Sequence, residues 1–167
     1  MELKKADLYF GSLLSLLVNN GLTPAILEQG EKRNIYKIST NKGDYKIFSK
    51  YRVLSKENSD SLNWQFSFSE AEIAEIRKLE GESDKLLLAF VCINDFEDRF
   101  KSELALLYPG ELKECLYIDE EYEGSQRLNI KYKKGNRGLN AYGIKRADYV
   151  NEQNNKIRVE RDRLIKL

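Results

Sequence analysis

The sequence predicts one α+β domain over residues 1–167, with a mixed, mostly antiparallel sheet, an N-terminal helix and two or three further short helices. Its 167 residues lie in the one-domain range, and no repeat or Pro/Gly/Ser-rich linker divides them. With 41% hydrophobic and 33% charged residues, the composition is that of a globular protein. Helical and alternating hydrophobic patterns follow one another along the chain, which indicates mixed secondary structure.

The first third of the chain predicts a helix followed by a hairpin. The stretch Ala6–Asn20 has a wide apolar face and ends in Asn-Asn-Gly, a typical helix stop. Pro24 then begins the extended segment "PAILEQ". The alternating stretches "NIYKIST" and "DYKIFSKYRVL" flank the turn sequence "NKG" and predict two paired strands. Alternation in the second strand separates an apolar face from a basic face.

The middle of the chain predicts a strand, a helix and a buried strand. In "NWQFSF" the three aromatic side chains share one strand face without interleaved basic residues, which favours core packing over base stacking. Ser69 and Glu72 have the spacing of a capping box, so a helix is expected to about Leu79. The run "KLLLAFVCI" is apolar on both faces and predicts a strand at the centre of the sheet.

The last third predicts short helices and a second hairpin. We expect one or two helices in "SELALLYPGELKECL", broken at Pro109, and a turn at "DEEYEG". The stretch "QRLNIKYKKGNRGLNAYGIKR" predicts a hairpin around "KKGNRG". The tail "NKIRVERDRLIKL" fits either a basic strand or a helix.

Composition restricts the possible chemistry. The chain has no histidine, so the usual Ser-His-Asp and Cys-His nucleophile systems are excluded, and a zinc site would lack its commonest ligand. Cys92 and Cys115 are isolated, which predicts reduced core thiols. No apolar run is long enough to cross a bilayer, and the N-terminus lacks a signal cleavage pattern. We therefore expect a cytoplasmic protein without membrane association, of bacterial or phage type.

Charge is unevenly distributed along the chain. Residues 1–56 carry ten basic and five acidic side chains, residues 57–123 carry six and eighteen, and residues 124–167 carry twelve and four. Two interpretations are open. The acidic and basic segments neutralise one another in the fold, or the basic ends form one surface for phosphate with the acidic segment on the far side.

Asp44-x-Lys46 is the one carboxylate-x-lysine match on a predicted strand, although chance alone accounts for about three such matches in a chain of this composition. The predicted order of elements over Ala6–Ile93 resembles the αβββαβ core of the PD-(D/E)xK nuclease-like superfamily. The resemblance implies that Asp44 and Lys46 take the D/E-x-K positions on the third strand. Asp44 would then bind Mg²⁺ with Glu28 as a second ligand, and Lys46 would orient the attacking water.

The chain departs from that family's pattern in two ways. No Pro-Asp pair lies upstream, and Asp44 follows directly after a turn, whereas a metal ligand is better held in the middle of a strand. We therefore expect a degenerate nuclease-like domain without strong catalysis. No cofactor is expected unless the protein cuts, in which case Mg²⁺ is required.

Basic residues give the binding prediction. Lys50 and Arg52 lie on the basic face of the strand over residues 44–52, and the second hairpin carries a further cluster whose glycines permit close approach to phosphate. The predicted nucleic-acid-binding residues are Lys50, Arg52, Lys131, Lys133, Lys134, Arg137, Lys145 and Arg146.

Two functions are compatible with these observations. The first is a small protein that associates with nucleic acid. The second is a protein-interaction module, such as an accessory or inhibitor subunit, that recognises a protein partner through separate acidic and basic surfaces. Salt distinguishes them, because nucleic-acid binding weakens steeply as ionic strength rises.

Overall fold

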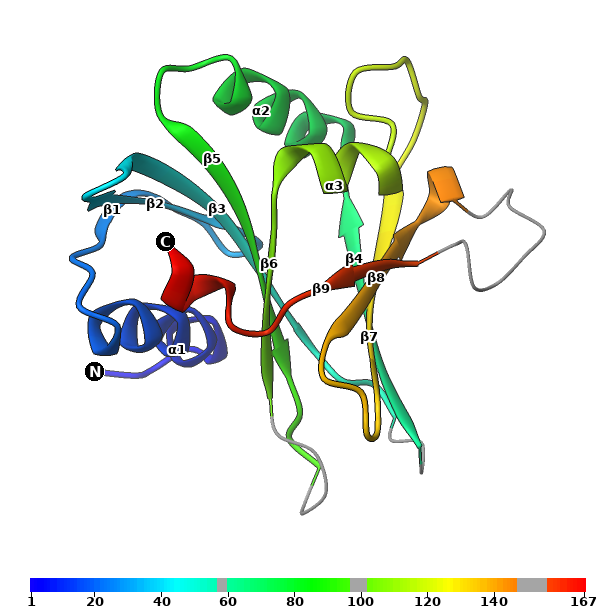
Figure 1. The fold of residues 1–167 in the computed structure, drawn as a ribbon, viewed down its shortest axis with the longest axis horizontal. Coiled ribbons are helices and arrows are strands. Elements are labelled where there is room, and N and C mark those ends of the chain that lie inside the picture. Colours follow the sequence, from blue (N-terminus) through cyan, green and yellow to red (C-terminus); the bar gives the residue numbers. More distant parts are fainter. Residues whose placement is uncertain (57–59, 97–101, 147–155) are drawn as a thin grey trace.

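Two β-sheets, which we name sheet A and sheet B, form the frame of the molecule in the computed structural model (Figure 1). The structure describes residues 1–56, 60–96, 102–146 and 156–167. Sheet A has the order β1-β2-β3-β5-β6 and sheet B the order β4-β7-β8-β9. Their strands are β1 (Ala25–Gln29), β2 (Asn34–Thr40), β3 (Gly43–Val53), β4 (Ser61–Phe68), β5 (Lys85–Ile93), β6 (Glu103–Leu107), β7 (Gln126–Lys133), β8 (Leu139–Gly143) and β9 (Ile157–Val159).

Strand pairing is mostly antiparallel, as the predicted fold class requires. Among the described strands, only β3 and β5 pair in parallel. The chain between them passes through β4 and the helix α2 (Glu70–Glu80), the kind of crossover that parallel neighbours need. The pairs of sheet B and the remaining pairs of sheet A are antiparallel. The single α+β domain is confirmed, but it contains two sheets where the sequence analysis expected one.

The N-terminal helix α1 (Lys5–Asn19) covers one face of sheet A, as expected. Its residues Leu13 and Leu17 are fully buried against Tyr36, Ile38 and other residues of β2, β3 and β5. The C-terminal 3-10 helix η3 (Arg163–Lys166) adds a buried leucine to the same cluster. Gly21, with φ of 76°, follows the end of α1 in the left-handed conformation that glycine adopts most easily.

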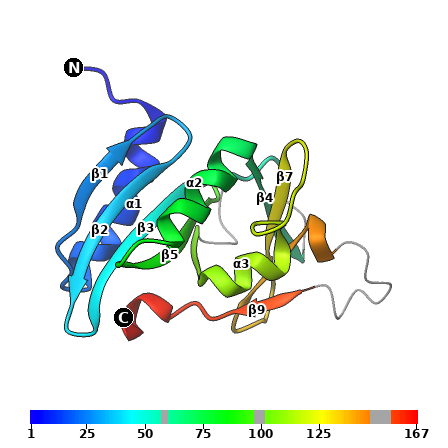
Figure 2. The same cartoon turned by 90° about the horizontal axis from the view of Figure 1, so that it is seen from above.

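A larger core lies between the two sheets, where α2 and α3 (Pro109–Cys115) also pack (Figure 2). The predicted burial of Trp64, Phe66 and Phe68 is confirmed, since each is at most 1% exposed. The predicted two-sided burial of β5 is also confirmed: Leu88 and Phe90 face the inter-sheet core, while Leu87 faces α1. Strand β5 lies inside sheet A, between β3 and β6.

Two local predictions need correction. Residues Glu103–Leu107 form strand β6 rather than a helix, because they complete the edge of sheet A beside β5. Pro109 begins α3 instead of breaking a helix, since a proline in the first turn of a helix loses no hydrogen bond. The tail contains both of the alternatives left open, with β9 preceding η3.

Among the described residues, no helix is both long enough and apolar enough to cross a membrane.

Candidate functional site

Asp44 lies at the start of β3, one residue after the β2–β3 turn, and its side chain is 44% exposed. Its Oδ2 is 3.2 Å from Nζ of Lys37, which is also 3.2 Å from Oδ2 of Asp84. A hydrogen bond from Ser39 and the Lys37 ammonium hold the pKa of Asp44 below its ordinary value of 3.8. This carboxylate is therefore satisfied by side chains of its own sheet.

Lys46 and Glu28 have other partners. Lys46 pairs with Glu82, in the loop after α2. Glu28 lies 2.9 Å from Arg33, which also forms a two-pronged pair with Glu75 at 2.9 and 2.8 Å. Glu28 and Lys46 do line one cavity of about 470 Å³, but Asp44 is not among its lining residues. The structure thus brings together two of the three predicted catalytic residues.

Further along β2 and β3, the polar side chains that face α1 are uncharged, so they add no carboxylate to the predicted metal site. Asn34 donates a hydrogen bond of 2.8 Å to the Tyr36 hydroxyl, and Ser49 is buried directly opposite Asn34. In the described parts of the chain, no three His, Cys, Asp or Glu side chains lie close enough together to hold a metal ion. Mg²⁺ needs several oxygen ligands in near-octahedral geometry, so these residues do not fit the metal that the nuclease resemblance implies.

Lys50, one of the predicted nucleic-acid-binding residues, does not lie on an open basic surface. It is only 6% exposed, and its Nζ lies 2.6 Å from Oε1 of Glu72 and 2.7 Å from the carbonyl oxygen of Ser67. Burial lowers the pKa of Lys50, while Glu72 opposes that shift. Its neighbour on the same strand face, Arg52, is exposed and has no ion pair with any described residue.

Two further predicted residues are half-buried and paired with carboxylates. Lys145 and Arg146 lie in the 3-10 helix η1 (Ile144–Arg146) after β8. Lys145 pairs with Glu120, and Arg146 lies 2.8 Å from Glu114 of α3. Their charges are largely balanced within the fold, so they contribute less to a phosphate-binding surface than the sequence suggested.

The same neutralisation extends over much of the acidic segment, residues 57–123. Basic residues from both ends of the chain pair with its carboxylates, in agreement with the first interpretation of the charge distribution. The pairs are Arg33–Glu75, Lys37–Asp84, Lys46–Glu82, Lys50–Glu72, Arg146–Glu114, Lys145–Glu120, Arg161–Glu103 and Arg163–Glu111.

Sheet B is different, because its face away from the core is polar and basic. Strand register fixes which side chains share this face: each alternates with a residue buried in the inter-sheet core. We call this set the outer face of sheet B. Its members are Ser61, Asn63, Gln65 and Ser67 of β4, Arg127, Asn129, Lys131 and Lys133 of β7, Asn140 and Tyr142 of β8, and Arg158 of β9.

The electrostatics of this face are one-sided. The four strands of sheet B contain four basic residues and no Asp or Glu. Lys134 and Arg137 extend the basic character into the exposed β7–β8 turn, where Gly135 has φ of 86°. Arg127, Lys131, Lys133, Lys134, Arg137 and Arg158 form no ion pair with any residue that the structure describes. The face therefore has a net positive charge.

The outer face also has a shallow hollow and fixed polar groups. Gln65, Arg127, Asn129 and Tyr142 contribute to a cavity of about 390 Å³. The Asn129 Oδ1 accepts a hydrogen bond of 3.2 Å from Asn63, which orders amide groups across neighbouring strands. Of these basic residues, the sequence pattern indicated Lys131, Lys133, Lys134 and Arg137 but not Arg127 and Arg158. Their alternation with buried Leu128 and Val159 was the available signal, but it does not say which strands are neighbours.

Comparison of the chain with protein-family models, curated proteins and solved structures found no match.

Proposed function

We propose that the protein binds nucleic acid through the outer face of sheet B and the adjoining β7–β8 turn. One observation carries this proposal: within four adjacent strands, β7 and β9 present Arg127, Lys131, Lys133 and Arg158 on one face, and none of the four strands contains a carboxylate. Elsewhere in the described chain, most basic side chains that lie near the acidic segment, residues 57–123, form ion pairs with its carboxylates.

The chemistry of the face suits a polyanion with hydrogen-bonding groups. Lysine and arginine supply affinity by neutralising phosphates, which releases condensed counterions. The Asn, Gln and Ser side chains between them both donate and accept hydrogen bonds, as sugars and base edges require. Relative to the sequence prediction, the interface gains Arg127 and Arg158 and loses Lys50, Arg52, Lys145 and Arg146.

Catalysis is not part of the proposal. The element order α1-β1-β2-β3, followed after β4 by α2-β5, supports kinship with the αβββαβ arrangement, with β4 as an added strand that belongs to sheet B. The residues that this resemblance assigned to Mg²⁺ are held by Lys37 and Arg33. We therefore favour a nuclease-like frame that binds without cutting.

The alternative, a protein-interaction module that uses separate acidic and basic surfaces, has less support. It needs an acidic surface free to meet a partner, whereas many carboxylates of residues 57–123 pair with basic side chains of the same chain. A protein partner would also give a weaker dependence of affinity on salt than a polyanion does.

The test is fluorescence anisotropy with labelled single-stranded and double-stranded DNA and RNA, titrated at several salt concentrations. We expect the triple variant Arg127→Ala/Lys131→Ala/Lys133→Ala to bind at least about tenfold more weakly than wild type. The slope of log affinity against log salt should fall by about three, close to one for each lost phosphate contact.

A matched control removes three charges from the opposite part of the molecule. Lys4, Lys5 and Lys78 are exposed and lie at α1 and α2, so Lys4→Ala/Lys5→Ala/Lys78→Ala changes net charge equally. This control should retain most of the affinity and the salt slope. Equal losses in the two triple variants, or no binding by wild type at low salt, would exclude the outer face as a nucleic-acid interface. Because the proposal includes no cutting, we expect plasmid DNA to remain intact after incubation with the protein and Mg²⁺.

A further inference from the structure

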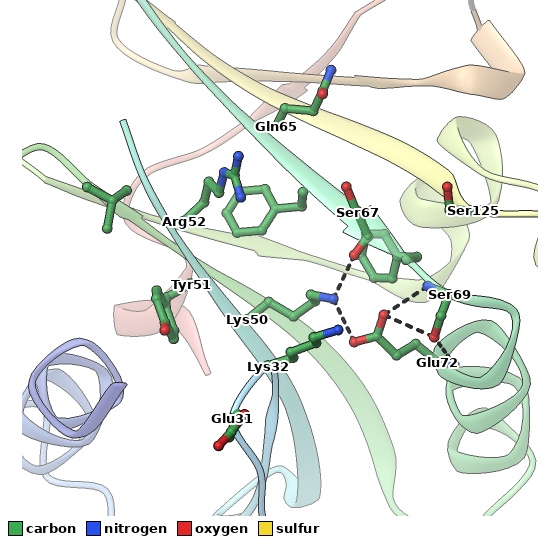
Figure 3. A pocket seen from close by; sticks show the side chains of 13 residues that line it. Glu31, Lys32, Lys50, Tyr51, Arg52, Gln65, Ser67, Ser69, Glu72 and Ser125 are labelled. Carbon is green, nitrogen blue, oxygen red and sulfur yellow. Dashed lines mark hydrogen bonds and ion pairs between the residues drawn. The ribbon is translucent and has the colours of Figure 1, made fainter. Parts of the chain in front are cut away.

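A cavity of about 660 Å³ lies where β3 of sheet A approaches β4, the edge strand of sheet B (Figure 3). We call it the inter-sheet pocket. Its wall includes Lys50 and Arg52 from β3, Ser67 and Phe68 from β4, and Glu72 from α2. Its volume is within the range of about 300–1,000 Å³ that is typical of small-molecule sites.

Lys50 and Glu72 form the fixed part of the pocket. Glu72 is occupied by the fold, because Oε1 accepts from Lys50 while Oε2 accepts from the Ser69 amide at 2.9 Å. The Lys50 ammonium has three N–H donors, two of which form hydrogen bonds to Glu72 and the Ser67 carbonyl. Its Nζ also lies 4.9 Å from the centre of the Phe68 ring, so a ligand would take the donor that is not hydrogen-bonded beside that ring.

Two more cations line the pocket without a partner. Arg52 and Lys32 are exposed, and neither forms a hydrogen bond or ion pair with the described residues. Lys32 lies close enough to Lys50 for their charges to repel, and Figure 3 shows it beside Lys50. Glu31 also lines the pocket and lies below Lys32 in Figure 3. The charges of Lys50 and Glu72 balance one another, so Arg52 and Lys32 against Glu31 leave the pocket with a net positive charge.

The remaining wall of the pocket combines buried aromatic rings with polar side chains. The rings of Phe66 and Phe68 close the pocket on the core side, and each is at most 1% exposed. Ser67, Ser125 and Gln65 supply hydroxyl and amide groups to the wall. The two phenylalanine rings are buried in the core and offer no face to a ligand, whereas an anionic group fits among the cations.

We propose that the inter-sheet pocket binds a phosphomonoester. The phosphate would lie among Lys32, Lys50 and Arg52, where the arginine fork and two ammonium groups match its charge and oxygen geometry. A free mononucleotide and the 5′-phosphorylated end of a strand share this chemistry. The inference stands on the pocket alone and does not require the outer face of sheet B to bind nucleic acid.

Isothermal titration calorimetry with AMP, inorganic phosphate and adenosine tests the pocket. We expect AMP and inorganic phosphate to bind to wild type, and adenosine, which lacks the phosphate, to bind at least about tenfold more weakly than AMP. Arg52→Ala and Lys32→Ala should each weaken AMP binding by about tenfold, the factor for one lost charge-assisted hydrogen bond. Both residues are exposed, so these variants leave the core intact.

Lys133→Ala, on the outer face of sheet B, is the matched control and should bind AMP as wild type does. A 5′-phosphorylated oligonucleotide compared with its 5′-hydroxyl form distinguishes the sources: a preference for the phosphorylated strand assigns the pocket to strand ends, and equal binding assigns it to free nucleotides. Equal affinity for AMP and adenosine, no AMP binding at millimolar concentration, or unchanged binding by both pocket variants would overturn the proposal. Loss of DNA binding in the outer-face triple variant with retained AMP binding would show the two sites to be separate.

Discussion

At the scale of single residues, Lys50 shows how an environment changes the role that a strand pattern suggests. Alternation correctly placed it on the same face as Lys46, Phe48 and Arg52. The pattern did not show that α2 and β4 cover part of this face, so that Lys50 is enclosed with Glu72 and the Ser67 carbonyl. A buried charge is tolerated only when it is paired and hydrogen-bonded, and Lys50 meets both conditions.

Replacing Lys50 should be costly because Glu72 would remain behind. Its side chain is only 14% exposed, so Lys50→Met leaves a mostly buried carboxylate without its cation. We expect unfolding free energy to fall by about 3 kcal/mol. Urea denaturation measures this loss.

The double variant Lys50→Met/Glu72→Gln provides the control. Glutamine still accepts a hydrogen bond from the Ser69 amide, so the helix cap survives while the unpaired charge is removed. Most of the stability should return. If the single variant is as stable as wild type, the ion pair contributes nothing to folding.

Individual residues also explain why the predicted metal site failed to form. Asp44 and Lys46 share a strand face, which the sequence correctly indicated. Their partners come from Lys37 on β2 and Glu82 after α2, residues 7 and 36 positions away, and no local pattern specifies such contacts. Local alternation is encoded by nearby residues, whereas the composition of a site depends on tertiary packing.

At the scale of elements, the best predictions were those with their own local signals. Strand β2 matches "NIYKIST" residue for residue, and both hydrogen bonds of the α2 capping box are present at 3.2 and 2.9 Å. Strand β6 was missed because "ELALL" has no alternation and good helix formers, so propensity favoured a helix. Its pairing with β5 overrides that preference.

The contact between α3 and β8 gives a prediction at this scale. A Cβ on Gly143 would lie 2.9 Å from the carbonyl carbon of Cys115 and closer still to its oxygen, so an alanine requires the backbone of α3 to shift. We expect Gly143→Ala to lower the unfolding free energy by about 1–3 kcal/mol. Thermal and urea denaturation of this variant and of wild type measure the difference in unfolding free energy.

Gly11 in the middle of α1 is the matched control. Nothing lies within 4 Å of a Cβ placed there, so Gly11→Ala should raise stability by about 0.5–1 kcal/mol through better helix propensity. Opposite signs for the two alanines are expected. A neutral Gly143→Ala would mean that α3 moves away from β8 without cost.

At the scale of the whole molecule, sheet A is the shared wall of two hydrophobic clusters. Its strands β2, β3 and β5 send side chains both to α1 and to the inter-sheet core. The sequence predicted this for β5 from its two-sided apolar pattern. It could not predict the division into two sheets, because a strand's own pattern shows a buried face but does not name the partner strands.

Because both hydrophobic clusters pack against sheet A, a substitution that destabilises one cluster should also destabilise the other. Leu13 of α1 is fully buried on the far side of sheet A from Trp64, the chain's single tryptophan. We expect Leu13→Ala to cost about 2–5 kcal/mol. The urea midpoint of Trp64 fluorescence should shift together with that of far-UV circular dichroism.

The exposed residue Leu8 on the same helix provides a control, since Leu8→Ala removes little buried surface and should shift neither midpoint appreciably. A Leu13→Ala protein whose fluorescence midpoint stays at the wild-type value while the dichroism midpoint falls would mean that the α1 layer unfolds independently of the inter-sheet core.

The hydrogen bond from Lys50 to the Ser67 carbonyl has one more consequence, which concerns solubility. β4 is an edge strand of sheet B, and open edges are where strands of other chains add on and start aggregation. At Ser67 an incoming strand would have to displace an ammonium group that is itself held by a carboxylate. The same lysine that lines the pocket therefore also protects this edge of the sheet from self-association.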